Sequence, residues 1–191
     1  MSLTHETRDI LENTDPGSPD PWSCIDNPSS PEEFFSCWIA LQSSFIPNAV
    51  QGVLILRESI AAGRGLQDGP QSYVPVSRWP DREMGTERLA EICERVLGER
   101  CGLLTELAAG PGPDRPGKSA GSYAIAYPLL VDGELAGAAA FEISARSEGE
   151  IRPAMEQLQW GMTSLELFFR RRDARDHVLE KARMRSAVDL L

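Results

Sequence analysis

Two apolar runs joined by Asp132-Gly133 form the most strongly patterned stretch of this sequence, from Ser122 to Ser144. Asp-Gly favours a two-residue β-hairpin turn, because both of its residues must adopt positive φ angles. Neither face of either run is polar, so the pattern predicts two central strands of an antiparallel sheet covered on both faces. The second run is rich in alanine and glycine, which predicts that another element packs very close to the sheet there.

Five further elements are predicted before this hairpin. A helix is expected to begin after Ser30, which can cap it with Glu33 completing a capping box. Prolines in the second strand place it at a sheet edge, and Gly98 is expected to follow the second helix. The elements are a helix over 31–45, strands over 50–56 and 73–80, a helix over 85–97 and a strand over 101–107.

A long amphipathic helix is predicted from Glu150 onward. Its apolar residues recur at alternating spacings of four and three, which is typical of a helix that packs against another helix. They are Ile151, Met155, Leu158, Met162, Leu165 and Phe169. Arg170-Arg171-Arg172 interrupts this stripe, and helical character resumes to Leu191. We expect this end to continue into a further, covalently linked output domain.

The pattern as a whole predicts an α+β fold, with a central antiparallel β-sheet covered on both faces and a long C-terminal helix. Three parts are expected: a mobile arm over 1–29, a domain over 30–172 and a helical extension over 173–191. The arm contains the proline-rich run from Asp15 to Pro21, which neither a helix nor a strand can span. Trp22 and Ile25 are the residues of the arm expected to dock.

Charge and composition argue against several classes of function. The formal net charge of −10 argues against nucleic acid or an anionic membrane as partner, and no apolar run approaches the roughly 20 residues that span a bilayer. The four cysteines (Cys24, Cys37, Cys93 and Cys101) show no CxxC spacing, so we expect reduced thiols in the cytoplasm. With only two histidines, no catalytic residue, metal or cofactor is expected.

One motif is a decoy. Gly112 to Ser119 satisfies the G-x-x-x-x-G-K-[ST] pattern of phosphate-binding loops. That loop works through successive backbone N–H groups followed at once by a helix, whereas here Pro113 and Pro116 remove two donors and a strand follows. A loop with a chance match is the favoured interpretation.

The order of elements resembles a GAF domain over roughly residues 31–172. The residues that carry the resemblance are Pro128-Leu129, Asp132-Gly133-Glu134 and Leu135-Ala136-Gly137-Ala138, which are similar to the hairpin of that family. The resemblance implies a central antiparallel β-sheet of five or six strands flanked by helices. It also implies that the first and last helices share one face of the sheet, while loops and the second helix cover the face where ligand-binding members hold their ligand. Trp38-Ile39-Ala40-Leu41 and Arg78-Trp79-Pro80 look similar to GAF modules placed N-terminal to HlyD-like membrane-fusion adaptors of bacterial efflux systems.

Two groups of side chains are candidates for binding. Tyr73, Trp79, Tyr123 and Tyr127 are suited to line a small-molecule pocket, although ordinary core packing explains them as well. Two helical stripes are suited either to an intermolecular bundle or to packing on their own sheet. These stripes include Trp38, Leu41 and Phe45 in the first helix and Leu158, Met162, Leu165 and Phe169 in the last.

The sequence therefore predicts a non-catalytic regulatory module that binds an unknown small molecule, forms a homodimer, or does both, and signals through its last helix. Two alternatives stay open. One is a thiol-dependent reductase of the methionine-sulfoxide type that uses Cys93 and Cys101, although buried cysteines more often act as small apolar residues. The other is a purely structural dimerisation module.

Overall fold

The computed structural model describes residues 24–25, 28–62, 71–81, 87–107 and 121–188, with side chains of the last helix described through Arg172 and at 174 and 175. A five-stranded sheet in the order β2-β1-β5-β4-β3, antiparallel throughout, forms its centre. This confirms the predicted α+β class and the central position of the hairpin strands. The strands are β1 (Ala49–Arg57), β2 (Tyr73–Trp79), β3 (Leu103–Leu107), β4 (Gly121–Val131) and β5 (Glu134–Ala145).

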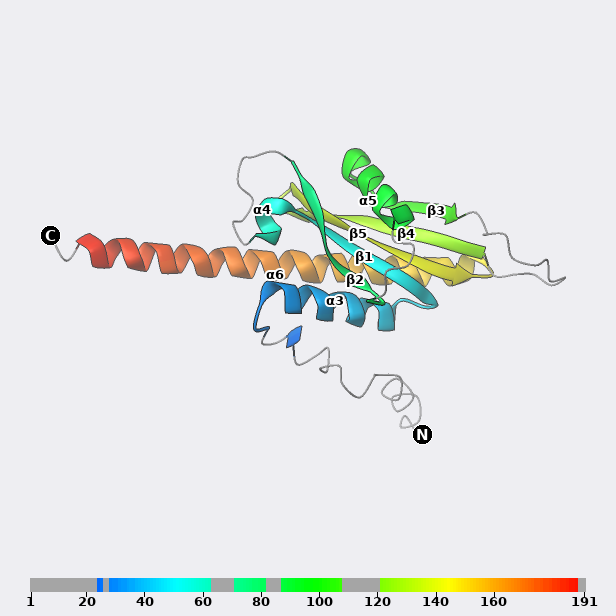
Figure 1. Ribbon diagram of the computed structural model, residues 1–191, viewed down its shortest axis with the longest axis horizontal. Coiled ribbons are helices and arrows are strands. Elements are labelled where there is room, and N and C mark those ends of the chain that lie inside the picture. The colour runs from blue at the N-terminus through cyan, green and yellow to red at the C-terminus, as the bar shows by residue number, and fades with distance from the viewer. Residues whose placement is uncertain (1–23, 26–27, 63–70, 82–86, 108–120, 189–191) are drawn as a thin grey trace, which may run out of the picture.

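Helices α3 (Pro31–Phe45) and α6 (Glu148–Val188) cover one face of the sheet and lie side by side (Figure 1). Their contacts show that they run antiparallel: residues later in α3 contact residues earlier in α6. Phe34 stacks on Phe168 with ring centroids 3.6 Å apart. Trp38 donates its indole N–H to the Ser164 hydroxyl at 3.1 Å. At Gly161 a Cβ would overlap the Gln42 side chain, so glycine permits the closest approach of the two helices.

Helix α5 (Glu87–Glu99) covers the opposite face (Figure 1). Its apolar residues Leu89, Ile92, Cys93 and Val96 pack on a floor of small side chains from β4 and β5. The floor consists of Ala124, Ala126, Ala138 and Ala140, all fully buried. The expectation that an element packs very close to the alanine-rich strand is thereby confirmed. A four-residue helix that the sequence did not predict, α4 (Glu58–Ala61), follows β1.

The hairpin turn forms as predicted, with Asp132 at φ 51° and Gly133 at φ 82°. A few residues along β5, a Cβ at Gly137 would overlap the backbone oxygen of Ile55 on the neighbouring strand. Glycine is therefore required where β5 and β1 approach.

Two details of the helix ends differ from the predictions, and the last helix shows where the expected extension begins. Ser30 caps α3 through the backbone N–H of Glu33, but the Glu33 carboxylate accepts from Ser29 N at 2.7 Å instead of closing a capping box on Ser30. Helix α5 includes Gly98 in its last turn instead of ending before it, and Arg100, just after the helix, adopts a positive φ of 55°. Helix α6 continues through Arg170–Arg172 without a break, so the predicted boundary at 172/173 falls inside one helix.

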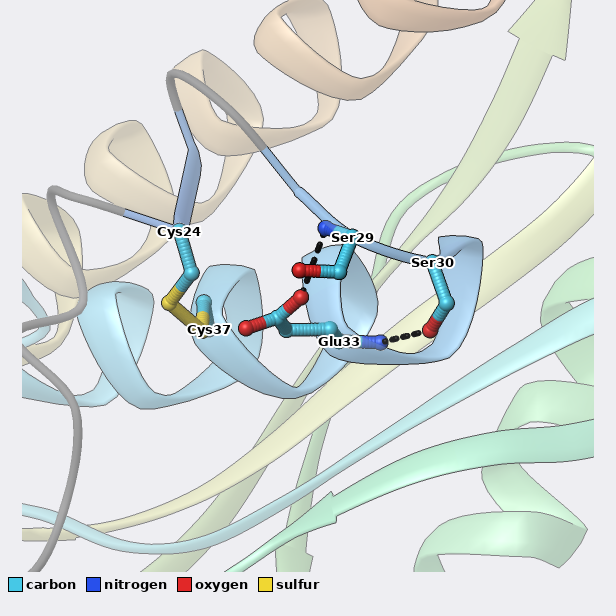
Figure 2. Close-up of a disulfide and its surroundings, with 5 residues drawn as sticks. All are labelled: Cys24, Ser29, Ser30, Glu33 and Cys37. Carbon is cyan, nitrogen blue, oxygen red and sulfur yellow. Dashed lines mark hydrogen bonds between the residues drawn. A yellow bond between two sulfur atoms is a disulfide. The ribbon is translucent and has the colours of Figure 1, made fainter.

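The prediction of four reduced thiols is wrong for two of them. Cys24 forms a disulfide with Cys37 on α3 (Figure 2). The two Cα atoms lie 6.3 Å apart, within the usual range for a disulfide, because the chain before α3 folds back along that helix. Ile25 packs against the core next to it, as expected. Trp22, most of the predicted arm and the decoy motif at 112–119 lie outside the described residues.

Candidate functional site

At one end of the sheet face under α5, the guanidinium groups of Arg57 and Arg100 both influence the Tyr73 hydroxyl. Arg57 closes β1 and is 8% exposed, and it lies on this face because it alternates with Val53 and Ile55, which pack under α5. Its register partner on β2 is Tyr73. Burial raises the pKa of Tyr73, and the nearby guanidinium groups of Arg57 and Arg100 oppose that rise.

The Tyr73 hydroxyl is buried and has no hydrogen-bond partner among the described residues. An unpartnered buried hydroxyl costs free energy, so a group that accepts or donates there would be favoured. Two cations and a hydroxyl are the donors that proteins use to hold carboxylate or phosphate oxygens. We call Arg57, Tyr73 and Arg100 the arginine cluster.

The other end of the same face carries a polar ladder across three adjacent strands. Glu142 on β5 accepts from the Gln51 side-chain amide of β1 at 2.6 Å, and its second oxygen accepts from the Ser122 hydroxyl of β4. Glu142 lies on this face because it alternates with Ala138 and Ala140. Both carboxylate oxygens are thus engaged by hydrogen bonds within the sheet.

The hairpin tip joins the two sides of the molecule. Arg100, which follows α5, donates to the backbone oxygen of Gly133 at 3.2 Å. Asp132 pairs with Arg170 of α6 at 3.0 Å, and Arg170 also pairs with Glu166 at 2.8 Å. These groups are substantially exposed, so each contact contributes at most about 1 kcal/mol. These contacts nevertheless connect Arg100, at the end of α5, and Arg170, on α6, to two consecutive residues of one turn.

The structure does not bring the four predicted pocket residues together. Tyr73 packs on the α5 side, whereas Trp79, Tyr123 and Tyr127 pack against the α3–α6 core. Tyr73 and Trp79 lie six residues apart, and a regular strand would place them on one face. A register irregularity in β2, opposite Leu54 and Ile55, reverses the alternation and separates them.

Tyr127 alone of these four lines an open cleft of about 280 Å³ between β3 and the start of α6. The walls combine apolar and charged side chains: Leu104, Glu148, Ile151, Arg152, Met155 and Glu156. Arg152 and Glu156 pair with each other at 2.9 Å. Burial raises the pKa of Tyr127, and Glu156 adds to the rise.

The predicted helix-bundle residues pack within their own chain. Trp38, Leu41, Leu158, Met162, Leu165 and Phe169 are all buried in the single molecule, while Phe45 is 44% exposed. The alternative of packing on their own sheet therefore accounts for this pattern, and a homodimer stays a prediction that requires another surface.

The two remaining cysteines differ in character. Burial raises the pKa of Cys93 to about 12, so its thiol carries almost no negative charge at neutral pH. Cys101 is exposed. Among the described residues, no group of three or more histidine, cysteine or acidic side chains is arranged to hold a metal ion, and no described helix is both long and apolar enough to span a membrane.

No family model matches the sequence, and no curated protein matches it significantly. The residues that sequence reasoning missed are Arg57, Arg100, Gln51, Ser122 and Glu142. A signal was present for two of them: Arg57 closes an otherwise apolar strand, and Glu142 interrupts an apolar one. A charged side chain in a buried run needs a partner or a ligand.

Proposed function

We propose that the chain is a non-catalytic, GAF-like regulatory module that binds a small anionic molecule at the arginine cluster and passes the effect of binding to α6. The observation that carries the proposal is the junction at the hairpin tip, where Arg100 from the α5 side and Arg170 from α6 contact Gly133 and Asp132.

The anionic character of the ligand follows from the donors. Arg57 and Arg100 both act on the Tyr73 hydroxyl, and a planar guanidinium matches two oxygens of a carboxylate or phosphate. Binding can shift a conformation only when the ligand has different affinities for two states. A ligand that draws Arg100 toward Tyr73 would compete with the Gly133 oxygen and so release or reposition the hairpin tip beside Arg170.

The experiment is native mass spectrometry of the full chain, repeated on the denatured sample, followed by thermal unfolding with inorganic phosphate and with citrate. Equal ionic strength of sodium chloride is the reference. We expect a retained mass or a rise in Tm with one of these anions, because a ligand that binds only the folded state stabilises it.

Arg57→Met tests the site, and Arg146→Met, on an exposed position after β5, is the matched control. The rise should disappear in the first variant and persist in the second. Equal responses of both variants, or none with the unmodified chain, would contradict ligand binding at the arginine cluster.

The alternative of a thiol-dependent reductase has one observation against it. The raised pKa of Cys93 keeps its thiol protonated, whereas the thiolate is the attacking species. Turnover of methionine sulfoxide that is lost in Cys93→Ser would restore that alternative. A purely structural module predicts no anion response at all.

A cytoplasmic location is part of the proposal, and the Cys24–Cys37 disulfide weighs against it, because disulfides are rare in reducing compartments. Alkylating the chain inside its intact native cells, before lysis, and then counting the modified cysteines of the denatured chain decides the point. Four thiols would support the cytoplasm, and two would favour an oxidising compartment.

A further inference from the structure

Two large apolar side chains lie exposed on the outward side of α6. Trp160 is 73% exposed and Leu167 is 49% exposed. They are seven residues apart and therefore share one face of the helix. That face differs from the one that packs on the sheet through Leu158 and Leu165 and from the one that meets α3 through Gly161.

This outward face has an internal symmetry about the point between Thr163 and Ser164. Three pairs of exposed residues at equal distances on the two sides of this point are either both apolar or opposite in charge. The pairs are Trp160 with Leu167, Glu156 with Arg171, and Pro153 with Ala174, and all six are exposed. The residues at the centre are small, which lets two helices approach closely.

We propose that this face packs antiparallel against the same face of a second copy of the chain. Trp160 then packs on Leu167 of the second copy, and Glu156 lies opposite Arg171 of the second copy, each contact occurring twice. A parallel arrangement would instead set Glu156 against Glu156 and Arg171 against Arg171, which is unfavourable. The charges therefore favour a second copy of this chain as the partner, and an antiparallel orientation of the two helices.

A tryptophan near the centre of a two-fold contact is a common binding hot spot. A pair of single helix faces lies at the low end of interface sizes, so the dimer dissociates on dilution. The second copy corresponds to the homodimer expected from the sequence, and this argument uses only α6 and stands without a ligand.

Sedimentation velocity of the full chain over a micromolar dilution series tests the proposal. Glu156→Arg and Arg171→Glu should each weaken the dimer about tenfold, because two symmetry-related pairs turn repulsive. The double variant should restore the affinity. Glu91→Arg, which makes the same charge change on an exposed position of α5, is the matched control and should leave the affinity unchanged.

A chain that stays monomeric at every concentration would overturn the proposal. So would single variants without effect, as a parallel dimer predicts, or a dimer that survives Trp160→Ser and is lost in Leu104→Ser on the edge strand β3. Circular dichroism checks that each variant is folded. The anion response of Trp160→Ser, measured separately, should equal that of the unmodified chain, so failure of the dimer and failure of ligand binding are distinguishable.

Discussion

Replacing Cys24 and Cys37 together by alanine is expected to lower the free energy of unfolding by about 3 kcal/mol. The disulfide joins residues separated by 13 positions. The loop-closure relation gives about 10 cal/mol/K of unfolded-chain entropy for such a loop, or about 3 kcal/mol at room temperature. Domains are commonly stable by only about 5–15 kcal/mol, so the effect is a large part of the total.

Urea unfolding followed by tryptophan fluorescence measures this difference. The variant should unfold at lower urea, and its m-value should rise because the uncrosslinked chain exposes more surface. Cys101→Ala is the matched control: its thiol is exposed, forms no disulfide and makes only a long 3.9 Å contact with the Glu99 carboxylate, so the free energy of unfolding should change by less than about 0.5 kcal/mol.

Two results would refute the reasoning. If denatured but unreduced protein alkylates four thiols instead of two, the crosslink is absent from the isolated chain. If two thiols alkylate and the double variant is nevertheless as stable as the unmodified chain, the crosslink forms but the loop-entropy estimate fails, for instance because residual structure already confines this segment in the unfolded state.

Three further outcomes are expected. Gly52→Ala sets a methyl group against the Phe141 ring and should lower the free energy of unfolding by roughly 1–3 kcal/mol. Gly98→Ala in α5, where a Cβ has nothing within 4 Å, should raise it by roughly 0.5–1 kcal/mol. Equal urea midpoints of the two variants would contradict the geometry. Ala140→Leu should lift α5 from its alanine floor at a cost of roughly 1–3 kcal/mol, and an unchanged midpoint would mean that the floor has room. The Cys93 thiol has a folded pKa of about 12 against an ordinary value of 9.0, so the unfolded chain ionises first. Stability should therefore fall above about pH 9 by up to roughly 1.4 kcal/mol per pH unit, a component that Cys93→Ala should remove.

Elements fixed by neighbouring residues were predictable from the sequence. The turn at Asp132-Gly133 and the start of α3 after Ser30 depend on local backbone preferences. Alternation along β4 likewise separates Ile125 from Ala124, because neighbouring residues of a strand point to opposite faces. The structure places Ile125 on the α3–α6 side and Ala124 on the α5 side.

Features that depend on distant segments were not predictable in the same way. The face on which Tyr73 lies is set by a register irregularity between β2 and β1, which the sequence of β2 does not specify. The placement of both Arg57 and Arg100 near Tyr73 depends on how β1 and the end of α5 are arranged in the fold. The pairing of Cys24 with Cys37 depends on the direction in which the chain enters α3.

The continuity of α6 also has a geometrical consequence for small motions. The last residue of its core-packed stripe is Phe169, and the helix continues to Val188, a further length of about 28 Å. A tilt of about 5° at Phe169 would therefore move the far end by about 2.5 Å, roughly half the pitch of an α-helix. A rearrangement at the hairpin tip that is too small to disturb the core would therefore displace the far end of α6 enough to change its contacts with a neighbouring helix.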